Sequence, residues 1–96
     1  MPTTEYDIQW ASKNGTVKTG TKLMIHNDGT NYTVNTNIQF FGRISIKKFS
    51  PNYAQGNDPI LILSADDGSA AEYRFRFATA ADMTRFYGDF QNAKDH

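Results

Sequence analysis

The sequence predicts a mainly β domain, in which a strongly bent, seven-stranded antiparallel sheet is closed by one C-terminal amphipathic helix. Three observations lead to this prediction. Apolar and polar residues alternate in several short runs, turn residues separate these runs at short intervals, and the apolar spacing changes to about 3.6 residues after residue 79. Alternation is typical of strands with one buried face, whereas the longer period is typical of a helix.

The first two strands are expected to form a hairpin. Tyr6, Ile8 and Trp10 alternate with polar residues, which predicts one apolar face and places Trp10 in the core. Asn14-Gly15 follows, a pair that favours a tight hairpin turn because both central residues must tolerate positive φ. Gly20 is expected to end the second strand.

Five further strands are predicted by the same alternation and by the turns between them. Ile44 and Ile46 are expected to point inward from one continuous strand, and residues 50–58 are expected to form a polar loop. The run Ile60–Leu63 is expected to be covered on both sides, since all four residues are apolar. The expected strands span about 6–12, 16–19, 22–26, 31–35, 43–49, 59–65 and 72–78.

A helix is expected over about residues 80–93. Thr79 can cap its first turn, with Asp82 three residues further on. One apolar stripe follows at helical spacing and comprises Met83, Phe86, Tyr87, Phe90 and Ala93. One helix cannot bury this aromatic stripe alone, so we expect it to close the open end of the sheet.

The composition limits the classes of function. The 96 residues suit one domain, 1–96, and the chain has no cysteine, which excludes disulfides, thiolate metal sites and cysteine nucleophiles. Ten basic and ten acidic residues cancel, which argues against a general nucleic-acid binder. The N-terminus lacks the basic and apolar regions of a signal peptide, so an intracellular protein is expected.

The predicted order of seven strands and one terminal helix is that of the pleckstrin-homology (PH) superfold. A five-stranded barrel would leave two strands unexplained, and a sandwich would leave the helix unexplained. Within this superfold the chain resembles the N-terminal PH domain of the TFIIH core-complex subunit that binds acidic activation domains. The resemblance rests on the segment from Ile44 to Pro51, with its Lys48-Phe49-Ser50-Pro51 step, and on Tyr73-Arg74-Phe75 before the helix.

The resemblance implies a nuclear protein-interaction module that binds acidic, partly disordered segments of transcription and DNA-repair factors and has no cofactor. The family's key lysine would be Lys48, with Phe49 beside it. The family also uses polar side chains in the following strand, and here that strand is the apolar run Ile60–Leu63. This departure puts that part of the family's binding surface in doubt.

The basic residues near the last three elements are the candidate peptide-binding site. Arg74 and Arg76 share one face by alternation, as do Arg43 and Lys47. If these faces adjoin, they attract an acidic peptide, and an aromatic residue supplies apolar contact. The alternative is an ordinary solvated face with cross-strand pairs to Glu72. The candidate site comprises Arg43, Lys47, Lys48, Phe49, Arg74 and Arg76, and the candidate aromatic anchors are Phe40, Phe41, Phe49 and Tyr53.

Two other functions stay open. A membrane-surface adaptor, which would be cytoplasmic, would bind phosphoinositide through Lys13, Lys18 and Lys22. These lysines are spread along the sequence, with no arginine among them, whereas a phosphate site needs several converging donors. A small viral or accessory protein that blocks a host partner could use the same scaffold.

Catalysis and metal binding find little support in the sequence. The only adjacent acidic pair, Asp66-Asp67, precedes Gly68-Ser69, and this combination predicts a turn. Neither His26 nor His96 has a second ligand at metal-binding spacing. The sequence therefore predicts a binding module without enzyme activity and without a metal.

Overall fold

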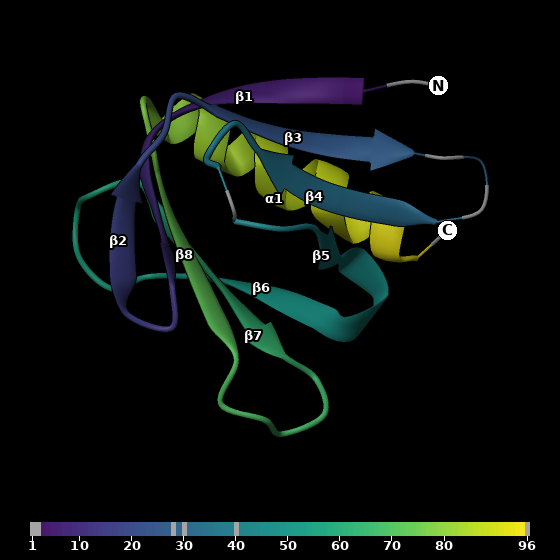
Figure 1. Ribbon diagram of the computed structural model, residues 1–96. Coiled ribbons are helices and arrows are strands. Elements are labelled where there is room, and N and C mark those ends of the chain that lie inside the picture. The colour runs from purple at the N-terminus through teal and green to yellow at the C-terminus, as the bar shows by residue number, and fades with distance from the viewer. Residues whose placement is uncertain (1–2, 28, 30, 40, 96) are drawn as a thin grey trace.

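The computed structural model describes residues 3–27, 29, 31–39 and 41–95. Figure 1 shows one bent sheet, with the helix running behind β3 and β4 while β6, β7 and β8 turn away from them. This arrangement confirms the predicted fold class, a bent antiparallel sheet with one C-terminal helix. The elements in chain order are β1 (Thr3–Lys13), β2 (Thr16–Thr19), β3 (Lys22–Asn27), β4 (Tyr32–Thr36), β5 (Ile44–Ser45), the 3₁₀ turn η1 (Ile46–Lys48), β6 (Phe49–Tyr53), β7 (Ile60–Ala65), β8 (Glu72–Phe77) and α1 (Ala80–Lys94).

The strand order along the sheet is β5-β4-β3-β1-β8-β7-β6, and β2 pairs separately with β1. The pairing is antiparallel throughout these strands. The first part of β1 pairs with β3, whereas its C-terminal part pairs with β2 and β8. We call the first part of β1 with β3, β4 and β5 the first half-sheet, and the C-terminal part of β1 with β2, β8, β7 and β6 the second half-sheet.

The turn between β1 and β2 has the predicted geometry. Asn14 and Gly15 have φ values of 52° and 92°. Two successive positive φ values match the right-handed twist of the flanking strands, which is why Asn-Gly favours such hairpins. β2 then ends at Thr19, and Gly20 lies so close to Ile38 that an added Cβ would sit 2.6 Å from its Cγ1.

A bulge in β1 overturns the prediction that Trp10 is a core residue. Ile8 pairs with Phe77, but Trp10 pairs with Arg76, so the two β1 positions correspond to one step along β8. The extra residue is Gln9. Beyond it, each β1 side chain points to the face opposite to the one that simple alternation predicts. Ala11 therefore points inward and is fully buried, while Trp10 lies half-buried on the outer face.

The single strand predicted over 43–49 is interrupted. β5 has only two residues, and the chain then makes the 3₁₀ turn η1 before β6 begins at Phe49. Ile44 and Ile46 are both buried as predicted, but the turn redirects the chain from the first half-sheet to the second. Simple alternation cannot hold across such a turn, and this division raises the strand count from the predicted seven to eight.

The predicted loop after residue 49 and the predicted double coverage of β7 also need correction. Residues 50–53 belong to β6, and Pro51 is buried there. Proline is tolerated because β6 is an end strand, where a missing N–H interrupts no central ladder. In β7, Leu63 is buried but Ile62 is half-exposed, since the helix and core cover only the inner face of this half-sheet.

The core lies between the inner faces of the two half-sheets and α1. Thr79 caps the helix as predicted, because its Oγ1 accepts a hydrogen bond of 3.1 Å from the backbone N–H of Asp82. Phe86 and Phe90 of the predicted apolar stripe are fully buried, and Phe86 contacts Phe77 with ring centroids 5.4 Å apart. The largest fully buried side chains are Tyr6, Phe75, Phe77, Phe86, Phe90, Leu23, Ile44, Ile46, Leu61, Leu63 and Val34.

Candidate functional site

Arg74 and Arg76 share the outer face of β8, as the alternation predicted. Tyr73, Phe75 and Phe77 between and beside them contact the core. Arg74 Nε donates to Glu72 at 2.7 Å, and Arg76 Nε donates to Gln9 at 2.9 Å. Arg76 also forms an ion pair of 3.4 Å with Asp58. Both carboxylates are well exposed, so these pairs contribute little stability and can exchange for other partners.

Arg43, Lys47 and Lys48 lie elsewhere, around η1. The prediction that Arg43 and Lys47 share a strand face is wrong, because β5 ends at Ser45. Lys47 Nζ instead donates to the backbone carbonyl of Lys94, at the C-terminus of α1, over 2.7 Å. Lys47 and Lys48 surround a surface hollow together with two acidic residues, Asp66 and Asp67. These carboxylates offset the lysine charges.

Phe49 points inward, away from the arginines. Its ring centroid lies 5.4 Å from that of Tyr73, and both residues pack against the core. Tyr73 and Arg74 are adjacent in β8 and therefore face opposite sides. The six residues predicted as one basic face thus do not share a face: Arg74 and Arg76 lie on the outer side, and Phe49 lies on the inner side.

The remaining candidate anchors also differ in accessibility. Phe41 is only 3% exposed, and Phe40 lies outside the described residues. Tyr53 is 49% exposed and stacks on Tyr87 of the helix, with centroids 4.6 Å apart. This stack joins β6 to α1.

Sequence reasoning missed an apolar surface around the two arginines. Arg76 pairs with Trp10 on one side and Ile60 on the other, and Arg74 pairs with Ile62. Paired residues in an antiparallel sheet point to the same face. We call this surface the outer patch, and it comprises Trp10, Val17, Ile60, Ile62, Arg74 and Arg76. Only the bulge at Gln9 brings Trp10 to this face, and no sequence pattern signals it.

The three lysines considered for phosphoinositide do not converge. Lys13 and Lys18 share one face of the β1–β2 hairpin by register, and Lys13 Nζ lies 6.0 Å from the centre of the Tyr73 ring. Lys22 belongs to the first half-sheet, where Asp7 binds its ammonium group. The hydrogen bond and charge of Asp7 raise the pKa of Lys22.

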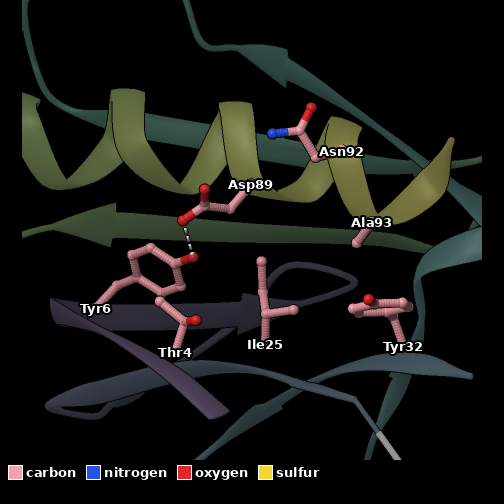
Figure 2. Close-up of a pocket in the computed structure, with 7 residues that line it drawn as sticks. All are labelled: Thr4, Tyr6, Ile25, Tyr32, Asp89, Asn92 and Ala93. Carbon is pink, nitrogen blue, oxygen red and sulfur yellow. Dashed lines mark hydrogen bonds between the residues drawn. The ribbon is translucent and has the colours of Figure 1, made fainter. Parts of the chain in front are cut away.

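A pocket of about 250 Å³ lies between α1 and the first half-sheet (Figure 2). The strands contribute Thr4, Tyr6, Ile25 and Tyr32. The helix contributes Asp89, Asn92 and Ala93. Figure 2 shows the side chains of Tyr6 and Asp89 pointing toward one another across this space. We call it the helix–sheet pocket.

Tyr6 and Asp89 form the polar contact of this pocket. The Tyr6 hydroxyl donates to Asp89 Oδ2 at 2.6 Å, although the two residues are 83 positions apart in sequence. Burial of Tyr6, followed by its bond to the Asp89 carboxylate, raises the pKa of the Tyr6 hydroxyl far above its usual range, and the nearby Arg85 opposes this shift. The hydroxyl therefore stays protonated and remains a donor.

A second polar contact joins the C-terminal end of the helix to the second half-sheet. Lys94 Nζ donates to the Phe49 carbonyl at 2.6 Å, to Ser50 Oγ at 2.8 Å and to Asp66 Oδ2 at 2.6 Å. Hydrogen bonds from Lys94 and Ser50 lower the pKa of Asp66. All three donors of the ammonium group are satisfied, so we assign this cluster a structural role.

No group of three or more histidine, aspartate or glutamate side chains among residues 3–27, 29, 31–39 and 41–95 could hold a metal ion. In the same residues, no helix has the length and apolar character needed to cross a membrane.

Comparison with known proteins returned no match to a protein-family model, to a curated protein or to a solved structure. The resemblance to the TFIIH subunit therefore stays a prediction.

Proposed function

We propose that this protein is a non-catalytic interaction module that binds an acidic peptide segment through the outer patch. The predicted resemblance would make the partner a transcription or DNA-repair factor. Two of the predicted basic residues, Arg74 and Arg76, remain in the proposed site. Arg43, Lys47, Lys48 and Phe49 do not, because they lie around η1 or face the core.

The observation that carries the proposal is the position of Trp10 beside Arg76. The bulge leaves this large aromatic side chain half-buried on the outer face of the second half-sheet. Tryptophan and arginine are the residues most enriched at the energetic centres of interfaces. Val17, 59% exposed, and Ile60 extend the apolar area around the charges.

The partner's chemistry follows from this combination. Carboxylates of a peptide would replace the exposed Glu72 and Asp58 as partners of Arg74 and Arg76, while apolar side chains would contact Trp10. Charge complementarity would then orient the bound peptide and raise its rate of association, and apolar burial would supply most of the affinity.

The test uses Trp10 itself, since it is the only tryptophan of the chain. Titration with an acidic, aromatic-containing activation-domain peptide that lacks tryptophan is expected to change its fluorescence in a saturable way. The double variant Arg74→Gln, Arg76→Gln should bind roughly tenfold or more weakly, because both charge contacts are lost. The matched control Lys47→Gln, Lys48→Gln should bind as the unmodified protein does.

Amide NMR shifts locate the bound peptide. Shifts confined to β1, β2, β7 and β8 support the outer patch. Shifts around residues 46–49, together with loss of peptide binding in the Lys47→Gln, Lys48→Gln variant, would instead place the site in the basic region predicted from the sequence. Binding of phosphoinositide headgroup with shifts at Lys13 and Lys18, and no response to peptide, would favour the membrane adaptor instead.

A further inference from the structure

The Asp89 carboxylate is only partly satisfied within the chain. Its Oδ2 accepts the hydrogen bond from Tyr6, but a carboxylate offers two oxygens with about four acceptor positions. Among the residues that the structure describes, ion pairs engage Asp7, Asp58, Asp66, Glu72 and Asp82, and Asp89 takes part in none of them. This half-buried anion therefore retains acceptor capacity at the wall of a pocket.

The nearest cation along the helix is bound to other groups. Arg85, one turn before Asp89, donates to the Glu5 carbonyl at 3.0 Å and to Asp82 at 3.3 Å. Its guanidinium lies 4.4 Å from the centre of the Tyr6 ring. On the strand side, His26 is bonded to Thr3, and both residues lie on the face of the first half-sheet opposite the pocket. Asp89 is the one charged residue that lines the pocket among those described.

The other walls suit a flexible apolar chain that ends in a charge. Ile25 and Ala93 supply aliphatic surface, and the Tyr32 ring offers a face that attracts cations. Thr4 and Asn92 add polar groups. Lysine and arginine side chains combine an aliphatic stem with a cationic end, and they typically bury the stem along apolar surface.

We propose that the helix–sheet pocket binds a lysine or arginine side chain of a partner peptide, with its cation on the Asp89 carboxylate and its stem against Ile25, Tyr32 and Ala93. The pocket faces α1 on the inner side of the first half-sheet, whereas the outer patch lies on the second half-sheet. The two sites are therefore separate. This proposal does not depend on the proposed function of the outer patch.

Amide NMR titration of the full chain with the blocked amino acids N-acetyl-lysine methylamide and N-acetyl-arginine methylamide tests the pocket directly. At least one should cause saturable shifts at Ile25, Tyr32, Asp89 and Ala93, with a dissociation constant on the order of millimolar, as expected for one side chain. The neutral analogue N-acetyl-norleucine methylamide, which keeps the stem but lacks the ammonium group, should bind roughly tenfold more weakly or not at all.

Two variants and one control define the role of Asp89. Asp89→Asn removes the charge but keeps an oxygen that can accept from Tyr6, so it should fold and bind roughly tenfold more weakly. Asn92→Lys, at an exposed helix position, places an ammonium group three residues after Asp89 and should compete with the ligand. The control Asp95→Asn removes a charge at the helix end and should leave binding unchanged.

The outcomes decide the proposal. Saturable shifts for a cationic probe, with binding weakened in both Asp89→Asn and Asn92→Lys, support it. It is overturned if neither cationic probe produces saturable shifts, if the norleucine analogue binds equally well, or if folded Asp89→Asn binds as tightly as the unmodified protein. Since no tryptophan lies in this pocket, these results do not bear on the Trp10 fluorescence test.

Discussion

Two of the polar contacts between α1 and the sheet differ in how fully the ionic group is satisfied. At the second half-sheet, Lys94 donates three hydrogen bonds, to Phe49, Ser50 and Asp66. At the first half-sheet, Asp89 accepts one hydrogen bond from Tyr6 beside a pocket. A saturated ion in a closed cluster fixes the helix, whereas a partly satisfied ion beside open space can bind a ligand. The predictions below compare these two contacts.

The largest effect is expected from Lys94→Met. Methionine retains most of the aliphatic stem but leaves the Phe49 carbonyl and Ser50 without the ammonium donor. We expect the free energy of unfolding to fall by about 2 kcal/mol, since hydrogen bonds to charged groups contribute about 1.5–3 kcal/mol. Urea denaturation at neutral pH measures this loss. Lys18→Met on the exposed β2 strand is the control, and an equal loss in both variants would show that the Lys94 cluster does not hold the helix.

Tyr6→Phe is expected to have a smaller effect, about 1 kcal/mol at neutral pH, because Asp89 can take water in place of the hydroxyl. The variant should also change the alkaline behaviour. The folded-state pKa of Tyr6 is raised, so the unmodified protein loses stability as the pH rises above the unfolded value of about 10. Tyr6→Phe removes that contribution. Urea denaturation between pH 8 and pH 11 should therefore give a shallower decline for the variant, and parallel curves would contradict the assignment.

The smallest effect is expected at acidic pH. The folded-state pKa of Asp66 is lowered, so its contribution to stability is present above the usual aspartate value and is lost as the pH falls through the folded value. Asp66→Asn should weaken the decline of stability below about pH 4. Part of the decline should remain, because hydrogen bonds from Ser69 also lower the pKa of Asp67. Stability curves of Asp66→Asn that match the unmodified protein below pH 4 would argue against the Lys94–Asp66 contact.

Local patterns in the sequence predicted the elements whose causes are local. The Asn14-Gly15 turn, the Thr79 cap and the shared face of Arg74 and Arg76 depend on neighbouring residues and on strand or helix period. These predictions were confirmed. The fold class followed from them, because seven strand patterns and one helix pattern leave few ways to bury the apolar faces.

The features that sequence could not predict depend on distant partners. The bulge at Gln9 arises from the register of β1 against β8, and a one-residue shift there moved Trp10 from the core to the surface. The 3₁₀ turn at 46–48 forms because the chain must pass there from the first half-sheet to the second. The Tyr6–Asp89 contact joins residues 83 positions apart. The candidate site was therefore predicted only in part, through its two arginines.

The shared strand β1 has a consequence for how the chain folds during synthesis. β1 is made first, but its C-terminal part pairs with β8, which is among the last segments to be made. Until then, one edge of β1 has no partner strand, and exposed edges of this kind pair readily with other chains. Pairing between strands that lie far apart in sequence also lengthens the search for the native topology, so we expect slow folding for a domain of this size. The same strand that joins the two half-sheets thus makes the nascent chain most prone to aggregation just before its last strand emerges.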